Sequence, residues 1–197
     1  MPLLKDGDLI ADPWTRWQPE TGDDSADLPA GPLLLDLETW RHHRDRLTAR
    51  RDPLGLWLSS DDDIDDFAPE DLARLSLIVL HLPRFTDGRP YSTARILRGR
   101  LGYRGALRAS GNILRDQLFF LQRCGIDEFD LPETAPVAAW RRAFGELSAV
   151  YQPASDRRQP AHRLRARTTS PAGRGTSVDV AAAPREAAAL GNAFWAY

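Results

Sequence analysis

The stretch "LIVLHLPRFTDGRPYSTARILRGRLGYRGALRAS", residues 77–110, holds the pattern that decides the fold. Its first six residues are apolar apart from one histidine, which is typical of a parallel strand that is buried on both faces. Asp87 and Gly88 then supply a turn, and Pro90 suits the first position of a helix that we predict over residues 90–100. Gly102 ends this helix, and residues 105–110 form the next predicted strand. The stretch therefore predicts a parallel strand–helix–strand unit.

The same alternation continues on both sides of this stretch. Strands are predicted at residues 33–37, 54–58 and 128–131, with a last strand at 150–152, and helices at 38–50, from 69 onward, at 113–124 and at 134–147. Asn112 is expected to cap the helix at 113–124, and Gly125 to close it. The sequence predicts an α/β fold, a single domain with a largely parallel sheet built from successive strand–helix units.

The ends of the chain have a different composition from its middle. Residues 1–30 are rich in Asp, Pro and Gly, and we expect an extended N-terminal arm there, partly packed through Trp14 and Trp17. The α/β domain is expected to span residues 31–155. Residues 156–197 form a polar C-terminal tail that we expect to be poorly ordered.

Composition excludes several classes of function. The single cysteine, Cys124, excludes a four-thiolate iron–sulfur cluster and a cysteine zinc site within one chain, and it is more typical of a core residue than of a nucleophile. The four histidines lack metal-ligand spacing, so we expect no metal. A net charge of −2 argues against nucleic-acid binding. Asp6 and Asp8 interrupt the start of the chain, and no apolar run is long enough to span a membrane, so we expect a cytoplasmic protein.

Charge is distributed unevenly along the chain. Residues 1–83 hold 18 acidic and 8 basic side chains, whereas residues 84–123 hold nine arginines and two acidic side chains. The loops after two predicted strands, at 83–89 and 110–112, should lie at the same edge of a parallel sheet and lead into helices. One hypothesis is a site for a small oxyanion or an acidic partner, made by Arg84, Asp87, Gly88, Arg89, Tyr91, Ser92, Arg95, Arg108, Asn112 and Arg115. The alternative is that these arginines pair with the aspartates of residues 61–66.

Beyond these patterns, the chain resembles a known family. "FTDGRPYSTARILRGRLGYRGALRASGNILRDQLFFLQRCGIDEFDL" (residues 85–131), with "LIVLHLPRF" before it and "AVYQPASDRR" after it, is similar to a proteobacterial family of conserved, uncharacterised proteins. Its members are encoded beside assimilatory sulfite reductase and are labelled as oxidoreductases of sulfite reduction. The resemblance covers about residues 30–165. Ala106 and Asn112 depart from the family pattern, which usually has an acid at the first position and commonly Asp at the second.

The resemblance implies a role in sulfate assimilation and cysteine biosynthesis. Sulfite reduction requires siroheme and an iron–sulfur cluster, and this chain has too few cysteines for that cluster, so we expect neither group here. The preferred interpretation is an accessory subunit whose arginine-rich edge engages the reductase, its electron donor or sulfite. A small oxidoreductase or other enzyme of the same pathway, binding an oxyanion substrate, is the alternative, and a binder of an acidic metabolite is a third. No flavin or nicotinamide site can be located from these residues, so the binding of such a cofactor stays open.

Overall fold

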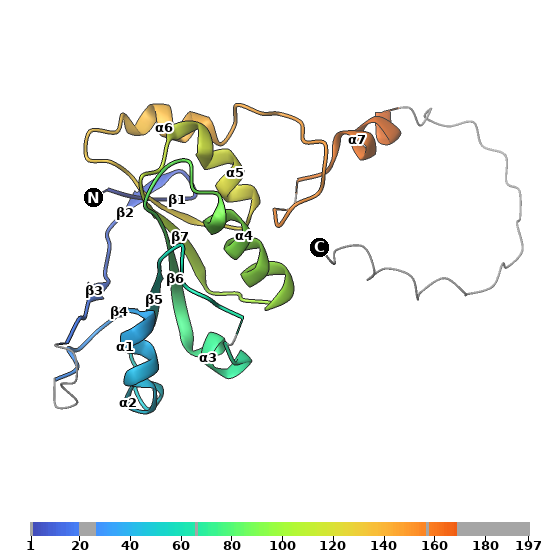
Figure 1. The fold of residues 1–197 in the computed structure, drawn as a ribbon. Helices are drawn as coiled ribbons and strands as arrows, with labels where there is room; N and C mark the ends of the chain where they lie inside the picture. Colours follow the sequence, from blue (N-terminus) through green and yellow to red (C-terminus); the bar gives the residue numbers. More distant parts are fainter. Residues whose placement is uncertain (1, 20–26, 66, 157, 169–197) are drawn as a thin grey trace, which may run out of the picture.

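The computed structural model describes residues 2–19, 27–65, 67–156 and 158–168. One eight-stranded sheet in the order β2-β1-β8-β7-β6-β5-β4-β3 forms its centre (Figure 1). The strands are β1 Leu3–Lys5, β2 Asp8–Ile10, β3 Thr15–Arg16, β4 Leu33–Asp36, β5 Leu54–Leu58, β6 Leu75–Leu82, β7 Ala106–Gly111 and β8 Glu128–Asp130. The helices are α1 Leu37–His42, α2 Arg44–Thr48, α3 Pro69–Arg74, α4 Arg89–Arg95, α5 Leu118–Arg123, α6 Val137–Ala143 and α7 Ala161–Thr168. A π-helical turn η1 (Ile96–Arg100) extends α4, and a 3-10 turn η2 (Arg115–Gln117) precedes α5.

Strands β3 to β8 pair parallel with one another, whereas β1 pairs antiparallel with both β2 and β8. The predicted α/β fold with a largely parallel sheet is therefore confirmed. Strand β5 has the predicted bounds, and β6 starts two residues earlier than predicted.

All the helices of the main core pack on one face of the sheet. Strands β3 to β8 follow one another across the sheet in chain order, so every connection steps in the same direction, and right-handed connections then place their helices on the same face. The main core accordingly joins Trp40, Leu97 and Leu118 from the helices to Leu56 and Ile78 from the strands. A second, smaller cluster of buried side chains contains Leu34, Leu77 and Val79, with Trp14, Trp57 and Ala106 packed against it, and includes no residue from the helices that the structure describes. We call this side of the sheet the helix-free face.

The sheet is strongly curled. Strands β2 and β3 are its two outermost strands, yet only five residue steps separate Ile10 from Thr15. Such a connection spans at most about 17 Å. Seven strand spacings across a flat sheet would measure about 34 Å. The two edges must therefore approach each other, and the connection passes across the helix-free face (Figure 1).

The N-terminal residues correct one prediction. They were expected to form an extended arm, packed only in part through Trp14 and Trp17; both indoles do pack on the sheet, but Leu3 and Leu4 are also 1% and 0% exposed, and β1 is a strand between β2 and β8. The partners of β1 are Glu128–Asp130, more than a hundred residues away in the chain. A local pattern of three residues carries no information about so distant a partner.

Several helices are shorter than predicted. The helix expected at residues 38–50 is divided into α1 and α2 at His43, and the one expected at 134–147 is reduced to α6. Residues 150–152 form a single bridge, Val150 to Pro160, instead of a strand. In the expected C-terminal tail, residues 161–168 form α7, whereas residues 169–197 lie outside the described part. Within the described part, no helix is long and apolar enough to cross a membrane, and no cluster of side chains has the composition of a metal site.

Candidate functional site

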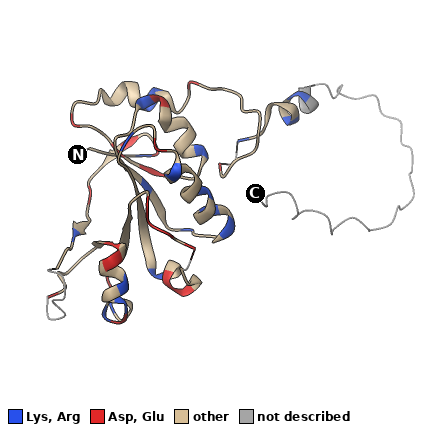
Figure 2. Cartoon of the chain, in the orientation of Figure 1, with Lys and Arg blue, Asp and Glu red and all other residues tan. Residues whose placement is uncertain are grey.

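The carboxyl edge of the parallel strands is where the predicted site residues were expected to meet. In a parallel sheet the loops after all the strands lie at this edge. Figure 2 shows acidic residues on α1 and α3 and basic residues at both ends of α4. The arginine-rich stretch thus lies beside the acidic part of the chain, and the contacts of its arginines show how much of its charge is already paired.

Arg89 does not offer a free cation. Its guanidinium donates to Asp87 at 2.7 and 3.0 Å and also pairs with Asp61. The hydrogen bonds from Arg89 lower the pKa of the Asp87 carboxyl far below its usual range. Arg100 pairs in the same manner with Asp65. The alternative interpretation, in which arginines of this stretch pair with the aspartates of residues 61–66, is confirmed for these two residues.

Arg108 lies far from a solvent-exposed rim, which corrects its predicted place in the site. It occupies the middle of β7 on the helix-free face, and its side chain is only 3% exposed. Its guanidinium makes a two-pronged contact with Asp12, at 2.9 and 3.2 Å, and contacts Glu128 at 3.0 Å and Asp130 at 3.9 Å. The pairing of β7 with β8 explains why Arg108 contacts Glu128, because these two residues lie directly opposite each other on the two strands. Its charge holds the N-terminal segment to the sheet.

Two further predicted residues have structural roles. The Arg115 side chain donates to the Ala139 carbonyl at 2.9 Å and pairs with Glu146. Asn112 caps no helix: its backbone N–H donates to the Leu82 carbonyl at 2.8 Å, which corrects the prediction. The chain is still turning at this point, because the preceding glycine has a φ of +96° and the first helical turn begins only at residue 115.

Arg98 explains another part of the basic stretch. Its guanidinium donates to the carbonyls of Gly125, Tyr103 and Gly105 at 2.8 to 2.9 Å and pairs with Asp127 at 2.5 Å. One arginine thus satisfies three backbone acceptors that lie on different loops. Several arginines of residues 84–123 therefore fasten loops to one another.

The remaining predicted residues lie around α4. Arg84, Ser92 and Arg95 are exposed, and their side chains have no hydrogen bond or ion pair with the residues that the structure describes. Gly88 immediately precedes the helix. Tyr91 is half-buried, and burial, together with Cys124 and Asp116, raises the pKa of its phenol to about 12. The structure thus brings Asp87, Gly88 and Arg89 together and leaves Arg84 as an exposed cation beside them.

An apolar patch at this edge was not predicted. The side-chain amide of Gln117 accepts from the Leu114 N–H at 3.0 Å and donates to the Phe85 carbonyl at 2.7 Å, so one amide holds two loops side by side. Phe85 and Leu114 are nevertheless 48% and 39% exposed. Phe120, 53% exposed, follows Gln117 by three residues, a spacing at which residues on a helix are neighbours. We call Phe85, Leu114 and Phe120 the Gln117 patch.

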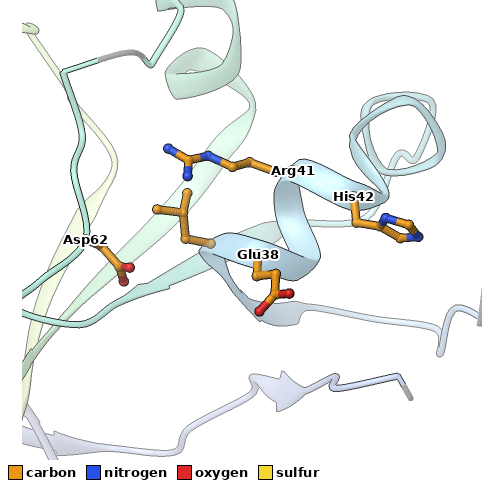
Figure 3. A pocket seen from close by; sticks show the side chains of 5 residues that line it. Glu38, Arg41, His42 and Asp62 are labelled. Carbon is orange, nitrogen blue, oxygen red and sulfur yellow. The ribbon is translucent and has the colours of Figure 1, made fainter. Parts of the chain in front are cut away.

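A hollow of about 450 Å³ lies at the same edge, where α1 follows β4 and Asp62 follows β5. Figure 3 shows Arg41 extending toward the loop that carries Asp62, with Glu38 at the start of the helix and His42 pointing away. Asp62 accepts a hydrogen bond from the Ser59 N–H at 2.6 Å, so its carboxylate is engaged in its own loop. The hollow is shallow and has charges of both signs.

The helix-free face carries a polar group that the sequence reasoning missed. His81 is opposite Ser110 in the pairing of β6 with β7, and Asp130 on β8 accepts a hydrogen bond from Ser110. Burial raises the pKa of the Asp130 carboxyl, whereas burial and the charge of Arg16 lower the pKa of His81. Polar residues occupy alternate positions on two of these strands: Arg108 and Ser110 on β7, and Glu128 and Asp130 on β8. This alternation was the signal that could have revealed a polar face.

Comparison with known proteins identifies the family. A family model described as bacterial protein of unknown function, DUF934, matches residues 55–162, which is more than half of the chain. A search of curated proteins finds no match. The matched range begins in β5 and ends in α7, so it covers the loops of the Gln117 patch and the polar group of β6 to β8. The chain belongs to the DUF934 family of bacterial proteins.

Proposed function

We propose that this protein is an accessory subunit of assimilatory sulfite reduction, in sulfate assimilation and cysteine biosynthesis, and that it docks on the reductase through the Gln117 patch. The pathway rests on the resemblance of about residues 30–165 to proteins encoded beside that reductase. The docking role rests on one observation, the exposure of Phe85, Leu114 and Phe120 around a single amide. Exposed apolar clusters with polar surroundings are characteristic of protein–protein contact sites.

The geometry of the patch favours binding by preorganised apolar contact. Because Gln117 fixes both loops, little loop entropy is lost when a partner covers them. Arg84 precedes Phe85 and has no ion pair with a described residue, so it supplies one cation at the rim of the patch. This differs from the arginine-rich edge that the sequence suggested, because Arg89, Arg108 and Arg115 are already paired within the chain.

Co-purification tests the proposal. The full chain, tagged and expressed with the sulfite reductase of the same cell, should capture the reductase. The exchange Phe85→Ser should weaken capture on the order of 30-fold if Phe85 anchors the contact. Tyr151→Ser removes an aromatic side chain that is 82% exposed outside the patch, and should leave capture unchanged. Equal loss from both exchanges, or no capture by the parent chain, would contradict the docking role.

The salt dependence of reductase binding separates the apolar contribution of the Gln117 patch from the charged contribution of Arg84. Arg84→Gln should lower the association rate at low ionic strength and have a smaller effect at high salt, because charges at a rim mainly steer encounter. Phe85→Ser should instead weaken the complex at every salt concentration, since apolar contact is not screened. A Phe85→Ser effect that disappears in salt would show that the patch does not act by apolar burial.

The polar group of the helix-free face supports a second candidate, a small oxidoreductase or other enzyme of the same pathway. Titratable groups with shifted pKa values concentrate at active sites, and His81 and Asp130 are two such groups near the carboxyl ends of β6 and β8, the two strands that flank β7. The absorption spectrum of freshly purified protein tests this candidate. A flavin or haem band, or turnover of sulfite by the isolated chain, would favour it over the accessory role.

A further inference from the structure

Trp57 stands between a cation and an imidazole on the helix-free face. Trp57 is on β5, which is next to β6, the strand that carries His81. On its other side, β4 separates β5 from β3, the strand that carries Arg16. The guanidinium carbon of Arg16 is 4.5 Å from the centre of the Trp57 ring, and the centre of the His81 ring is 5.1 Å from that of the indole. Contact with one rigid indole restrains both side chains.

The surroundings of His81 decide which ring nitrogen carries the proton. Nδ1 is shielded from solvent and has no hydrogen-bond partner among the described residues. Gly111 covers it closely: a Cβ on that residue would lie 2.9 Å from Nδ1. A proton on Nδ1 would be desolvated and unbonded, which is costly. The neutral imidazole therefore holds its proton on Nε2 and presents this nitrogen as a donor. Burial and Arg16 also lower the pKa of His81, which favours the neutral ring.

Arg16 retains its donors for an outside acceptor. It is exposed and makes no ion pair with the residues that the structure describes. Of the carboxylates on this face, Asp36 accepts the Thr39 N–H at 2.8 Å, and Asp12 is bound to Arg108 through both oxygens. Burial of Asp36 opposes its ionisation, but hydrogen bonds and the nearby charge of Arg16 lower the pKa of this carboxyl. Arg16 thus lies near one ionised acid without forming an ion pair with it, and the aromatic ring that holds its guanidinium cannot accept all of its N–H bonds.

We propose that Arg16 and His81 form a binding site for a small oxyanion beside Trp57, at the carboxyl ends of the central strands. A guanidinium and a neutral Nε2–H are two fixed donors, which suits sulfate, sulfite or phosphate through their several acceptor oxygens. None of the arginines first expected to bind an anion takes part. The site is separate from the Gln117 patch, so the inference does not rest on the docking role.

Isothermal titration of the full chain with sulfate and with sulfite, at constant ionic strength, tests the site. Saturable binding is expected, and Arg16→Gln should weaken it on the order of tenfold or more, the usual effect of removing a charged hydrogen bond. His81→Phe keeps a ring against Trp57, removes the donor, and should also weaken binding. Arg41→Gln is the matched control, because Arg41 is an exposed arginine on α1 without an ion pair to a described residue.

A measurement on the unaltered chain guards against variants that fail to fold. Addition of sulfate should shift the Nε2 resonance of His81 in nitrogen–proton spectra, more than those of the other three histidines. No saturable binding, equal weakening by Arg41→Gln, or an unmoved His81 resonance would overturn the proposal. Arg84→Gln should bind sulfate normally, so failure here and failure of reductase capture are distinguishable.

Discussion

Replacement of Arg108 by methionine should be one of the most destabilising single changes in this chain. Methionine fills much of the same volume but removes the charge that faces Asp12, Glu128 and Asp130. The side chains of Glu128 and Asp130 are only 7% and 14% exposed, so water cannot replace the lost guanidinium. Removal of one partner of a buried ion pair costs about 3–5 kcal/mol. In a chain of this length that corresponds to a fall of roughly 6–20 °C in Tm.

Urea unfolding followed by tryptophan fluorescence measures the loss, with Arg100→Met as the matched control. Arg100 and Asp65 are 57% and 60% exposed, so their pair should contribute at most about 1 kcal/mol. Combining Arg108→Met with Glu128→Gln should recover part of the loss, because one buried carboxylate is then neutral. Equal destabilisation by Arg108→Met and Arg100→Met would refute the account of the helix-free face as a desolvated ion cluster.

The pH dependence of the Arg108→Met variant provides a second, independent test. Burial already raises the pKa of Asp130, and the charge of Arg108 opposes that rise, so in the variant the pKa of Asp130 in the folded state should move further above its unfolded value. The folded state then binds more protons than the unfolded state, so stability increases as pH falls. The variant should therefore recover stability relative to the parent chain as the pH falls from 7 through the raised pKa of Asp130 toward the usual range of an aspartate, about 4. A constant difference across that range would contradict the proposed cause.

Two further predictions concern single side chains. Gly105→Ala should destabilise the domain by about 1–3 kcal/mol, because a Cβ at this position would lie 2.2 Å from the Tyr103 hydroxyl. Gly88→Ala is the control in the same unfolding assay. It should be close to neutral, because a Cβ at residue 88 would have no atom within 4 Å. The phenol of Tyr91 has a pKa raised to about 12 by burial, so its contribution to stability should persist below pH 10 and be lost as the pH rises toward 12. Ultraviolet titration of the parent chain and of Tyr91→Phe measures this, and ionisation of Tyr91 near pH 10 would contradict it.

The sequence predicted those parts of the fold that depend on local pattern. Strand β5 and most of β6 were found because continuous apolar runs between turn residues identify buried parallel strands. The helix expected after Asn112 began too early, because the backbone there bonds to β6 instead of starting a helix. The N-terminal strands were missed, because their partners are determined by the closure of the sheet and not by neighbouring residues.

The candidate site was harder to predict than the fold. The arginine count in residues 84–123 drew attention to charge, but the count does not distinguish paired from unpaired guanidiniums. Pairing depends on which loops meet, as the contacts of Arg89 with Asp61 and of Arg98 with three carbonyls show. Conversely, the Gln117 patch is made by ordinary residues on separate loops, and only the fold brings Phe85 and Leu114 together.

The position of β1 has a consequence for the order in which this chain can fold during synthesis. Leu4 leaves the ribosome well before its partner Phe129 is made, because 125 positions separate the two in the chain. Until then Leu3 and Leu4 remain uncovered, and the nascent chain exposes apolar groups that its own C-terminal half will eventually cover. Closure of the sheet must therefore be a late event, and anything that delays the appearance of β8 prolongs the period in which the emerging polypeptide can aggregate.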